Sequence, residues 1–191
     1  MTVFSRRSVL AGLGAATVAG LSAPSGLHAA DAPAVAWGFT FPSIEGGTLD
    51  LSSFRGRVLL VANTASFCGY TPQYKGLEAL HKEFSPQGLT VVGIPSNDFG
   101  QESDSNGKVK TFCEATFDVQ FPMGGLSHVK GGDAAPFYRW VSDTRHWEPS
   151  WNFCKVLVGR DGNIRSTFSS NDLPDGDRMR SEIRGALEAT V

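Results

Sequence analysis

The stretch that decides the fold is "RVLLVANTASFCGYTPQYKGLEALHKEFSPQGLTVVGIPS", residues 57–96. It opens and closes with mostly apolar runs, at 57–66 and 89–96, of the kind that form buried strands. Between them, apolar residues recur at helical spacing from Tyr74 to Phe84. The pattern therefore predicts a β-α-β unit whose two strands are parallel and joined by a right-handed crossover.

The flanking sequence extends this unit in both directions. It predicts a hairpin over 39–56 around Gly46 and Gly47, helices near 106–116 and 133–143, a hairpin over 152–170 turning at 161–163, and a final amphipathic helix over 176–190. A parallel β-α-β unit followed by a hairpin and a closing helix is the thioredoxin plan. The expected fold class is α/β, a thioredoxin-like fold with a central mixed sheet flanked by helices and an added N-terminal β-hairpin.

A single cysteine, Cys68, lies in the turn between the first strand of this unit and its helix. We expect Thr71 to cap that helix and Pro72 to occupy its first position. Ligands commonly bind at this edge of an open α/β sheet, and unpaired amides at a helix start favour a thiolate. On position alone, an inert buried cysteine is an equally good interpretation, because most free cysteines are small buried hydrophobes.

Length and charge narrow the function further. A chain of 191 residues with 41% hydrophobic and 19% charged residues has enough material for one core. The net charge is −2, and no run of lysine or arginine follows the first few residues, which argues against a nucleic-acid partner. The three cysteines and four histidines are scattered without ligand spacing, so we predict no metal site.

The first thirty residues are typical of an export signal. Paired arginines in "SRRSVL" (5–10) precede an uncharged stretch over 8–30, and small residues follow in "GLHAADAPA" (26–34). This layout predicts a cleaved twin-arginine-type signal over 1–30, with a retained membrane anchor as the alternative. We expect residues 31–191 to form a single periplasmic domain without a stable membrane anchor.

Three separated blocks resemble the signature sequences of the glutathione peroxidase family in its cysteine form. They are "NTASFCGYTPQYKGLEAL" (63–80), "GIPSNDFGQE" (93–102) and "WNFCKVLVGRDG" (151–162). The likeness runs from about residue 36 to the end of the chain. It implies a thiol peroxidase on a thioredoxin fold.

Residue by residue, the resemblance implies that Cys68 attacks the peroxide and that Gln101, Trp151 and Asn152 assist it. Reducing a hydroperoxide needs a thiolate that attacks one peroxide oxygen, which leaves a sulfenic acid on the enzyme. Indole and carboxamide N–H groups are neutral donors that can hold the thiolate and stabilise the leaving oxygen. The loop before Gln101 is one residue shorter than in most members of the family, so Gln101 has to reach the thiol by a shorter path.

A second thiol is implied by the same resemblance. Cys113, in "KTFCEATFDVQFP" (110–122), matches a position at which some members carry a resolving cysteine that condenses with the sulfenic acid. A Cys68–Cys113 disulfide would require local unwinding of the predicted helix around Cys113, because the two residues lie on different elements. An inert helix cysteine is the alternative. We interpret Cys154 as a buried hydrophobe, with a backup thiol as the minority view.

Other redox proteins fit less well. A thioredoxin-like disulfide oxidoreductase needs a second thiol where Thr71 stands, and a peroxiredoxin has threonine where Ala65 stands. A peroxide-sensing thiol protein that relays oxidation to a partner remains open as the alternative function.

The remaining expectations concern substrates and partners. We expect hydrogen peroxide and organic or lipid hydroperoxides as substrates, and protection against oxidative stress as the outcome. The reductant is expected to be an external thiol, a thioredoxin-like protein or glutathione, with no bound cofactor. A thioredoxin-like protein is favoured over glutathione, because no cluster of lysines or arginines that could bind a glutathione carboxylate flanks the three blocks. The short connection at 142–152 favours a monomer or weak dimer.

Overall fold

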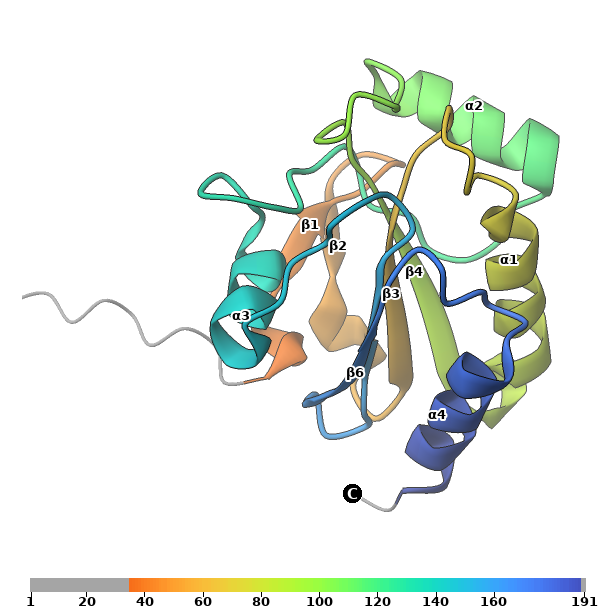
Figure 1. Cartoon of the computed structure of the whole chain (residues 1–191), viewed down its shortest axis with the longest axis vertical. Coiled ribbons are helices and arrows are strands. Elements are labelled where there is room, and N and C mark those ends of the chain that lie inside the picture. The colour runs from red at the N-terminus through yellow and green to blue at the C-terminus, as the bar shows by residue number, and fades with distance from the viewer. Residues whose placement is uncertain (1–34, 190–191) are drawn as a thin grey trace, which may run out of the picture. The chain divides into compact units, whose positions relative to one another are not determined.

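A four-stranded sheet in the order β4-β3-β5-β6 forms the centre of the fold (Figure 1). Its strands are β3 (Val58–Thr64), β4 (Leu89–Pro95), β5 (Lys155–Val158) and β6 (Ile164–Phe168). β3 and β4 are parallel, as the sequence predicts, whereas β5 runs antiparallel to both β3 and β6. The computed structural model describes residues 35–189, so the predicted export signal lies outside the described residues.

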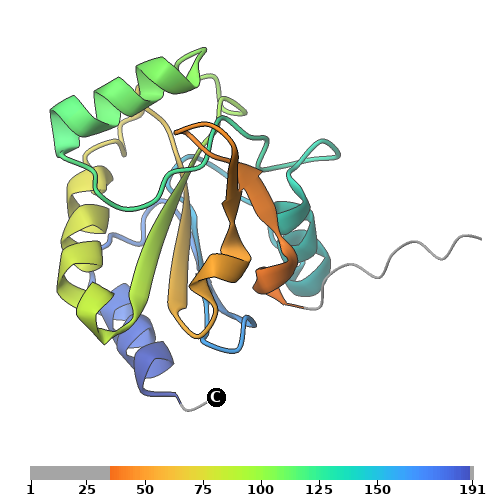
Figure 2. The same cartoon turned by 180° about the vertical axis from the view of Figure 1, so that it is seen from behind.

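Helices and a separate two-stranded hairpin surround this sheet (Figures 1 and 2). They are β1 (Thr40–Pro42), β2 (Thr48–Asp50), α1 (Gln73–Phe84), α2 (Asn106–Phe117), α3 (Pro136–Arg145) and α4 (Asp177–Glu188), with short 3-10 turns η1 (Ala36–Gly38), η2 (Leu51–Phe54) and η3 (Ser85–Gln87). Each element predicted between residues 39 and 190 is present within a few residues of its expected bounds. The mixed sheet, its helices and the added hairpin confirm the predicted fold class.

The central strand supplies side chains to two cores, one on each face of the sheet. Val58, Leu60 and Ala62 pack with α1 and α4, while Leu59 and Val61 pack with the hairpin and α3. This alternation follows from the two-residue period of a strand. Because both faces are covered, every residue of β3 is buried, which explains why its sequence is a nearly unbroken apolar run.

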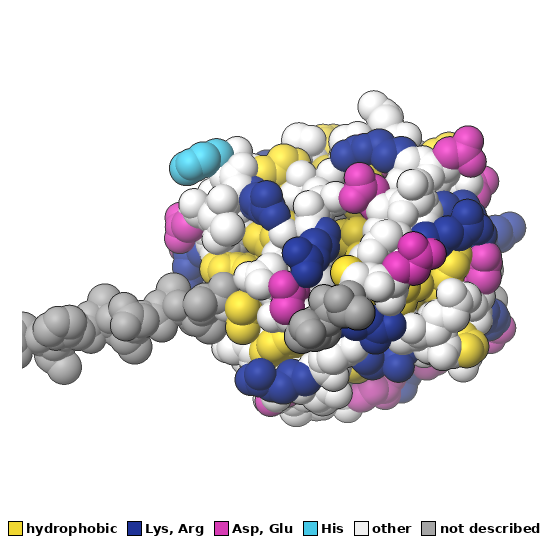
Figure 3. Space-filling model, turned by 90° about the horizontal axis from the view of Figure 1, so that it is seen from below, with side chains coloured by type: hydrophobic (Ala, Val, Ile, Leu, Met, Phe, Trp, Pro, Cys, Tyr) yellow, Lys and Arg dark blue, Asp and Glu magenta, His cyan; other side chains and the backbone are white. Residues whose placement is uncertain are grey.

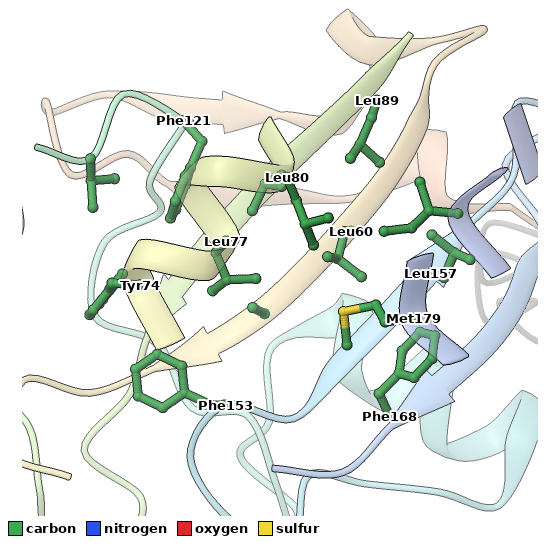
Figure 4. Packing of buried hydrophobic residues seen from close by; sticks show 14 of the residues in the cluster. Leu60, Tyr74, Leu77, Leu80, Leu89, Phe121, Phe153, Leu157, Phe168 and Met179 are labelled. Carbon is green, nitrogen blue, oxygen red and sulfur yellow. The ribbon is translucent and has the colours of Figure 1, made fainter. Parts of the chain in front are cut away.

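Helix α1 covers one face of the sheet through the residues that its spacing predicts. Figure 4 shows the side chains of Leu77 and Leu80 directed toward Leu60 of β3, with Tyr74 beside Phe153. Each fully buried leucine contributes about 1.5–3 kcal/mol to stability through the apolar area that it removes from water. These contacts hold the start of α1, and therefore the turn that precedes it, firmly against the sheet.

The predicted N-cap of α1 is wrong. Pro72 occupies the cap position, and no side chain caps the helix. The Thr71 hydroxyl is instead turned back into the preceding loop, where it bonds to the backbone of Cys68 and Ala65. A threonine hydroxyl can satisfy loop amides as readily as helix amides, and here the loop geometry decides between them.

Strand direction brings three distant segments to one edge of the sheet. Parallel strands β3 and β4 end at the same edge, and the antiparallel β5 begins there, with Ala62 of β3 opposite Lys155 of β5. The loop after β3 carries Cys68, the loop after β4 carries Gln101, and Trp151 and Asn152 precede β5. The topology therefore gathers the three blocks of the sequence around one point.

The surface charges are mixed, as the low net charge and the scattered lysines and arginines of the sequence predict. Basic and acidic side chains are interspersed on the face seen from below in Figure 3, without a large patch of one sign. Within residues 35–189, none of the helices combines the length and the apolar character that crossing a bilayer requires.

Candidate active site

The loop that holds Cys68 is braced from within by Thr71. The Cys68 amide donates to the Thr71 hydroxyl over 3.0 Å, and that hydroxyl donates to the Ala65 carbonyl over 2.9 Å. The Tyr70 amide lies 3.4 Å from the Cys68 sulfur and donates to it. Cys68 is 8% exposed. Thr71, which occupies the position of the second cysteine of a disulfide oxidoreductase, therefore serves to shape the loop that presents the Cys68 sulfur.

Gln101 reaches this loop in spite of its shortened approach. Its backbone carbonyl accepts a hydrogen bond from the Phe67 amide at 3.0 Å, directly beside Cys68. Its side-chain oxygen accepts a hydrogen bond from the Asn152 carboxamide at 2.9 Å. The positive φ of 68° at Gly100 provides the tight turn that redirects the chain before Gln101. The structure thus joins Gln101 to Asn152 and to the Cys68 loop.

Asn152 is held in place by a residue that sequence reasoning missed, Asn63 at the end of β3. The Asn63 carboxamide donates to the Trp151 carbonyl at 2.9 Å, and the Asn63 carbonyl accepts from the Phe153 amide at 2.7 Å. Asn63 is fully buried. The sequence signal for this role is a carboxamide within a mostly apolar strand, because a buried carboxamide normally requires hydrogen-bond partners.

Backbone strain marks the same segment. Phe153 has a φ of 61°, in the left-handed region that residues with a Cβ rarely adopt. The Asn152 carbonyl also accepts a hydrogen bond from the Ser170 hydroxyl at 2.7 Å. This kink buries the Asn152 side chain completely while its neighbour Trp151 remains 40% exposed. The turn therefore presents two adjacent donors in different directions.

The Trp151 ring packs on the loop that carries Gln101. The centroids of the Trp151 and Phe99 rings are 5.2 Å apart. The Lys130 ammonium lies 4.4 Å from the centroid of the Phe99 ring. An indole with 40% exposure is not a core aromatic. The pairing connects the two loops that precede α2 and β5, and so fixes the side of the site on which the indole stands.

Cys113 lies on α2, close to the Cys68 loop but in a different environment. It is 2% exposed, and burial raises its pKa to about 11. Both cysteines belong to the same cluster of buried residues, and the rings of their neighbours Phe67 and Phe112 are 6.3 Å apart. Both sulfurs are free thiols. A cavity between the β1–β2 hairpin and α2 is lined by Cys113 and not by Cys68, so it is separate from the Cys68 loop.

Cys154 is also a buried free thiol, 2% exposed. Its sulfur lies 3.7 Å from the Ser170 hydroxyl. Its backbone carbonyl accepts a hydrogen bond from the Asn63 amide at 3.2 Å. These contacts place it in the packing that supports Asn152.

Comparison with known proteins gives a consistent result. The model of the family described as glutathione peroxidase matches residues 37–142, more than half of the chain. The hydroperoxy fatty acid reductase gpx1 of Synechocystis sp. is 38% identical over 150 residues, which cover 73% of this chain and 89% of that protein. The chain belongs to the glutathione peroxidase family.

Two further relatives agree with this membership of the glutathione peroxidase family. The glutathione peroxidase-like peroxiredoxin gpx1 of Schizosaccharomyces pombe is 38% identical over 148 residues, which cover 75% of this chain and 92% of that protein. The crystal structure of Trgpx in apo form has 31% sequence identity and a TM-score of 0.67, and the match covers 82% of this chain and 98% of that one.

Family membership establishes the class of reaction. The protein is a thiol peroxidase, an oxidoreductase that reduces hydroperoxides. The alternative of a peroxide sensor is not favoured, because these relatives bear the names of peroxidases and reductases.

Proposed function

We propose that Cys68 is the thiol that attacks the hydroperoxide, with Gln101, Trp151 and Asn152 as donors, and that Cys113 resolves the oxidised enzyme. The Cys68 thiolate attacks one peroxide oxygen as the O–O bond breaks, which gives a sulfenic acid on Cys68 and an alcohol or water. The leaving oxygen needs a proton or strong hydrogen bonds. Neutral amide and indole N–H groups can supply those bonds without competing for the peroxide as nucleophiles.

The observation that carries this proposal is the meeting of Gln101 and Asn152. Their side chains are joined at 2.9 Å, and the Gln101 carbonyl binds the residue before Cys68. The two carboxamides, from loops about fifty residues apart in sequence, thus meet beside the loop that carries Cys68. Such preorganised dipoles lower the barrier because they need no rearrangement when charge develops on the leaving oxygen.

The packing of α2 supports the resolving role of Cys113. Two of its twelve residues, Val109 and Cys113, are buried, and Phe112 and Phe117 are partly buried against the same core, whereas α1 buries six residues. Fewer buried contacts therefore oppose a local opening of α2 than of α1. Once exposed, Cys113 can condense with the sulfenic acid to give a Cys68–Cys113 disulfide and water. In an oxidising compartment this disulfide protects Cys68 from further oxidation to a sulfinic acid.

The proposed reductant is a thioredoxin-like protein, with no bound cofactor. A dithiol releases itself from a mixed disulfide by internal attack, so it reduces a protein disulfide faster than a monothiol such as glutathione. We further propose that the enzyme acts in the periplasm as a monomer or weak dimer and protects against oxidative stress. The arginine pair and uncharged stretch of residues 1–30 support export.

We propose hydrogen peroxide and organic or lipid hydroperoxides as substrates. Phe67 and Trp151, on loops that border Cys68, are 65% and 40% exposed. An apolar rim of this kind suits an acyl chain as well as a small peroxide. The name of the Synechocystis relative, a hydroperoxy fatty acid reductase, agrees with that range.

A coupled assay tests the proposal. The protein without residues 1–30 is given hydrogen peroxide or a fatty acid hydroperoxide, with a thioredoxin system or glutathione as reductant. Cys68→Ser is expected to lower turnover about 1,000-fold or more, because the nucleophile is lost. Cys113→Ser should oxidise once and then turn over poorly with thioredoxin.

Cys154→Ser is the matched control, and it should retain wild-type turnover. Turnover by Cys68→Ser would show that Cys68 is not the nucleophile. Full thioredoxin-dependent turnover by Cys113→Ser would show that Cys113 is not the resolving cysteine. Rapid oxidation of the wild-type protein without recycling by any reductant would favour a peroxide sensor.

A further inference from the structure

A second hydrogen bond holds Asn152 through its backbone, whereas Gln101 holds it through its side chain. The Asn152 carbonyl accepts from the hydroxyl of Ser170, a buried residue in the loop after β6, at 2.7 Å. The Ser170 carbonyl in turn accepts from the side-chain amide of Gln73, the first residue of α1, at 2.7 Å. Ser170 therefore connects the turn that carries Asn152 to the start of the helix that follows Cys68.

Together with the contacts of Gln101, these bonds close a ring that includes the nucleophile. On one side, the residue before Cys68 donates its amide to the Gln101 carbonyl at 3.0 Å, and the Gln101 side chain accepts from Asn152 at 2.9 Å. On the other side, Asn152 is bonded to Ser170, and Ser170 to Gln73. The chain from residue 67 to residue 73 contains Cys68 and completes the ring. Asn152 is thus fixed relative to the Cys68 loop from two directions.

The orientation of the Gln73 carboxamide is set by a buried lysine. The Lys155 ammonium donates to the Gln73 side-chain oxygen and, at 2.8 Å, to the Asp172 carbonyl. Burial lowers the pKa of Lys155 to about 8, so at pH 7 the ammonium form, which has no acceptor, predominates. The Gln73 oxygen must therefore face Lys155, and its nitrogen must face the Ser170 carbonyl.

The Ser170 hydroxyl has two neighbours, and their chemistry decides where its proton points. The Asn152 carbonyl oxygen lies 2.7 Å from the hydroxyl oxygen, and the Cys154 sulfur lies 3.7 Å from it. A carbonyl oxygen is a stronger acceptor than a thiol sulfur, and 2.7 Å is an ordinary O–H···O distance. The Ser170 hydroxyl therefore donates to Asn152, and the Cys154 thiol can donate to Ser170.

This support acts on a strained part of the backbone. Phe153, directly after Asn152, has a φ of 61°, and such a conformation persists only where the surroundings hold it. The peptide unit that joins the two residues is bonded at both ends. Its N–H donates to the Asn63 carbonyl at 2.7 Å, and its carbonyl accepts from Ser170. These two bonds fix the plane of that peptide unit and so limit the direction in which the Asn152 side chain leaves the backbone.

We propose that Ser170 is a positioning residue for Asn152 in the reduction of hydroperoxides. Gln73 and Lys155 hold Ser170 in place for this task. The inference rests on the proposed role of Asn152 as a donor, because Ser170 acts through Asn152 and not on the peroxide itself. A donor fixed in this way needs no rearrangement when the O–O bond breaks and charge develops on the leaving oxygen.

The rate of Cys68 oxidation tests this role without the resolving step or a reductant. The reduced protein is mixed with hydrogen peroxide, quenched at intervals with an alkylating agent, and analysed by mass spectrometry for the remaining Cys68 thiol. Asn152→Ala is expected to lower the second-order rate constant about 100-fold, and Ser170→Ala about tenfold, because the donor is then displaced but not lost.

The matched control is Ser169→Ala. It removes a hydroxyl from the neighbouring residue of the same loop, which donates to the Asp172 carboxylate at 2.8 Å and not to Asn152. This variant should keep the wild-type rate of Cys68 oxidation. Gln73→Glu gives a second test of the ring, because it keeps an acceptor for Lys155 and loses the donor to Ser170. It should slow the oxidation as Ser170→Ala does, and it decides the matter if Ser170→Ala does not fold.

Two further readouts distinguish positioning from a general loosening of the site. Alkylation of Cys68 by iodoacetamide needs an accessible thiolate but no donor to a peroxide oxygen, so Ser170→Ala should change its rate by less than about twofold. In a protein that already carries Asn152→Ala, Ser170→Ala should slow peroxide reduction no further. The reason is that a residue acting through the Asn152 carboxamide then has nothing left to position.

The outcomes that overturn the inference differ from those that overturn the proposed function. Ser170 does not position Asn152 if Ser170→Ala and Gln73→Glu react with peroxide at the wild-type rate. The same conclusion follows if Ser170→Ala slows alkylation as much as oxidation, or if its effect is undiminished beside Asn152→Ala. If Asn152→Ala alone reacts with peroxide at the wild-type rate, the proposed donor role of Asn152 fails, and the role of Ser170 fails with it.

Discussion

Helices α1 and α2 have the same length and very different anchorage. Each has twelve residues, but α1 buries six side chains and α2 buries two. The first residue of α1, Gln73, accepts a hydrogen bond from the buried Lys155 ammonium and donates to the Ser170 carbonyl at 2.7 Å. No side chain caps the start of α2 at Ser105. The first residue of α1 is thus held by two side-chain hydrogen bonds, to Lys155 and Ser170, whereas the first residue of α2, Asn106, is held by one, from the Leu126 amide at 2.8 Å.

This difference matches the two tasks assigned to the thiols. A nucleophile works best when it is held at a fixed distance from its donors, because the correct geometry is then in place before the substrate arrives. A resolving thiol has to travel, so the element that carries it should open at a modest cost in free energy. Substitutions in the two helices should therefore have different consequences.

The largest expected effect comes from truncating the core of α1. Leu77→Ala should lower the free energy of unfolding by about 2–5 kcal/mol, because it leaves a cavity at a fully buried position. Urea denaturation followed by circular dichroism measures this loss. Leu173→Ala, at a residue that is 48% exposed, is the control and should cost less than about 0.5 kcal/mol. Equal losses for the two variants would show that α1 is not the anchored helix.

An intermediate effect should depend on pH through the anchor of α1. Burial lowers the pKa of Lys155 to about 8 from 10.5, so between these values the unfolded chain binds more protons than the folded one. Stability carried by this group is therefore lowest below pH 8 and rises with pH. The free energy of unfolding of the wild type, minus that of Lys155→Met, should increase by about 2 kcal/mol between pH 7 and 9.5. Urea denaturation at several pH values measures it, and a flat difference would mean that Lys155 is not held as a buried, desolvated cation.

The smallest expected effect on stability, and the most informative for function, lies in α2. Val109→Ala should cost about 1 kcal/mol, and it should speed amide hydrogen exchange within α2 about fivefold because the helix opens more often. Disulfide formation after Cys68 oxidation should accelerate by a similar factor if opening limits it. Lys108→Ala, at an exposed neighbour, is the control. Faster exchange without faster disulfide formation would separate the opening of α2 from the resolving step.

Much of the site was within reach of sequence reasoning because its parts lie at the ends of strongly patterned elements. The buried runs and the helical spacing over residues 57–96 predict the β-α-β unit, and the unit alone places Cys68 at a sheet edge. The resemblance of three blocks supplied Gln101, Trp151 and Asn152. Asn63 escaped notice, because its partners lie about ninety residues away and a single polar residue in a strand does not reveal them.

The sequence by itself determined the order of elements, the two faces of the sheet and the presence of a thiol before α1, since these depend on local periodicity and composition. Only the tertiary structure decided what each polar side chain does. It placed the Thr71 hydroxyl in the Cys68 loop and not at the helix start, joined Gln101 to Asn152, and buried the Glu102 carboxyl next to Gln101. The physical reason is that hydrogen bonds and desolvation depend on neighbours brought together by strand direction, which no local pattern records.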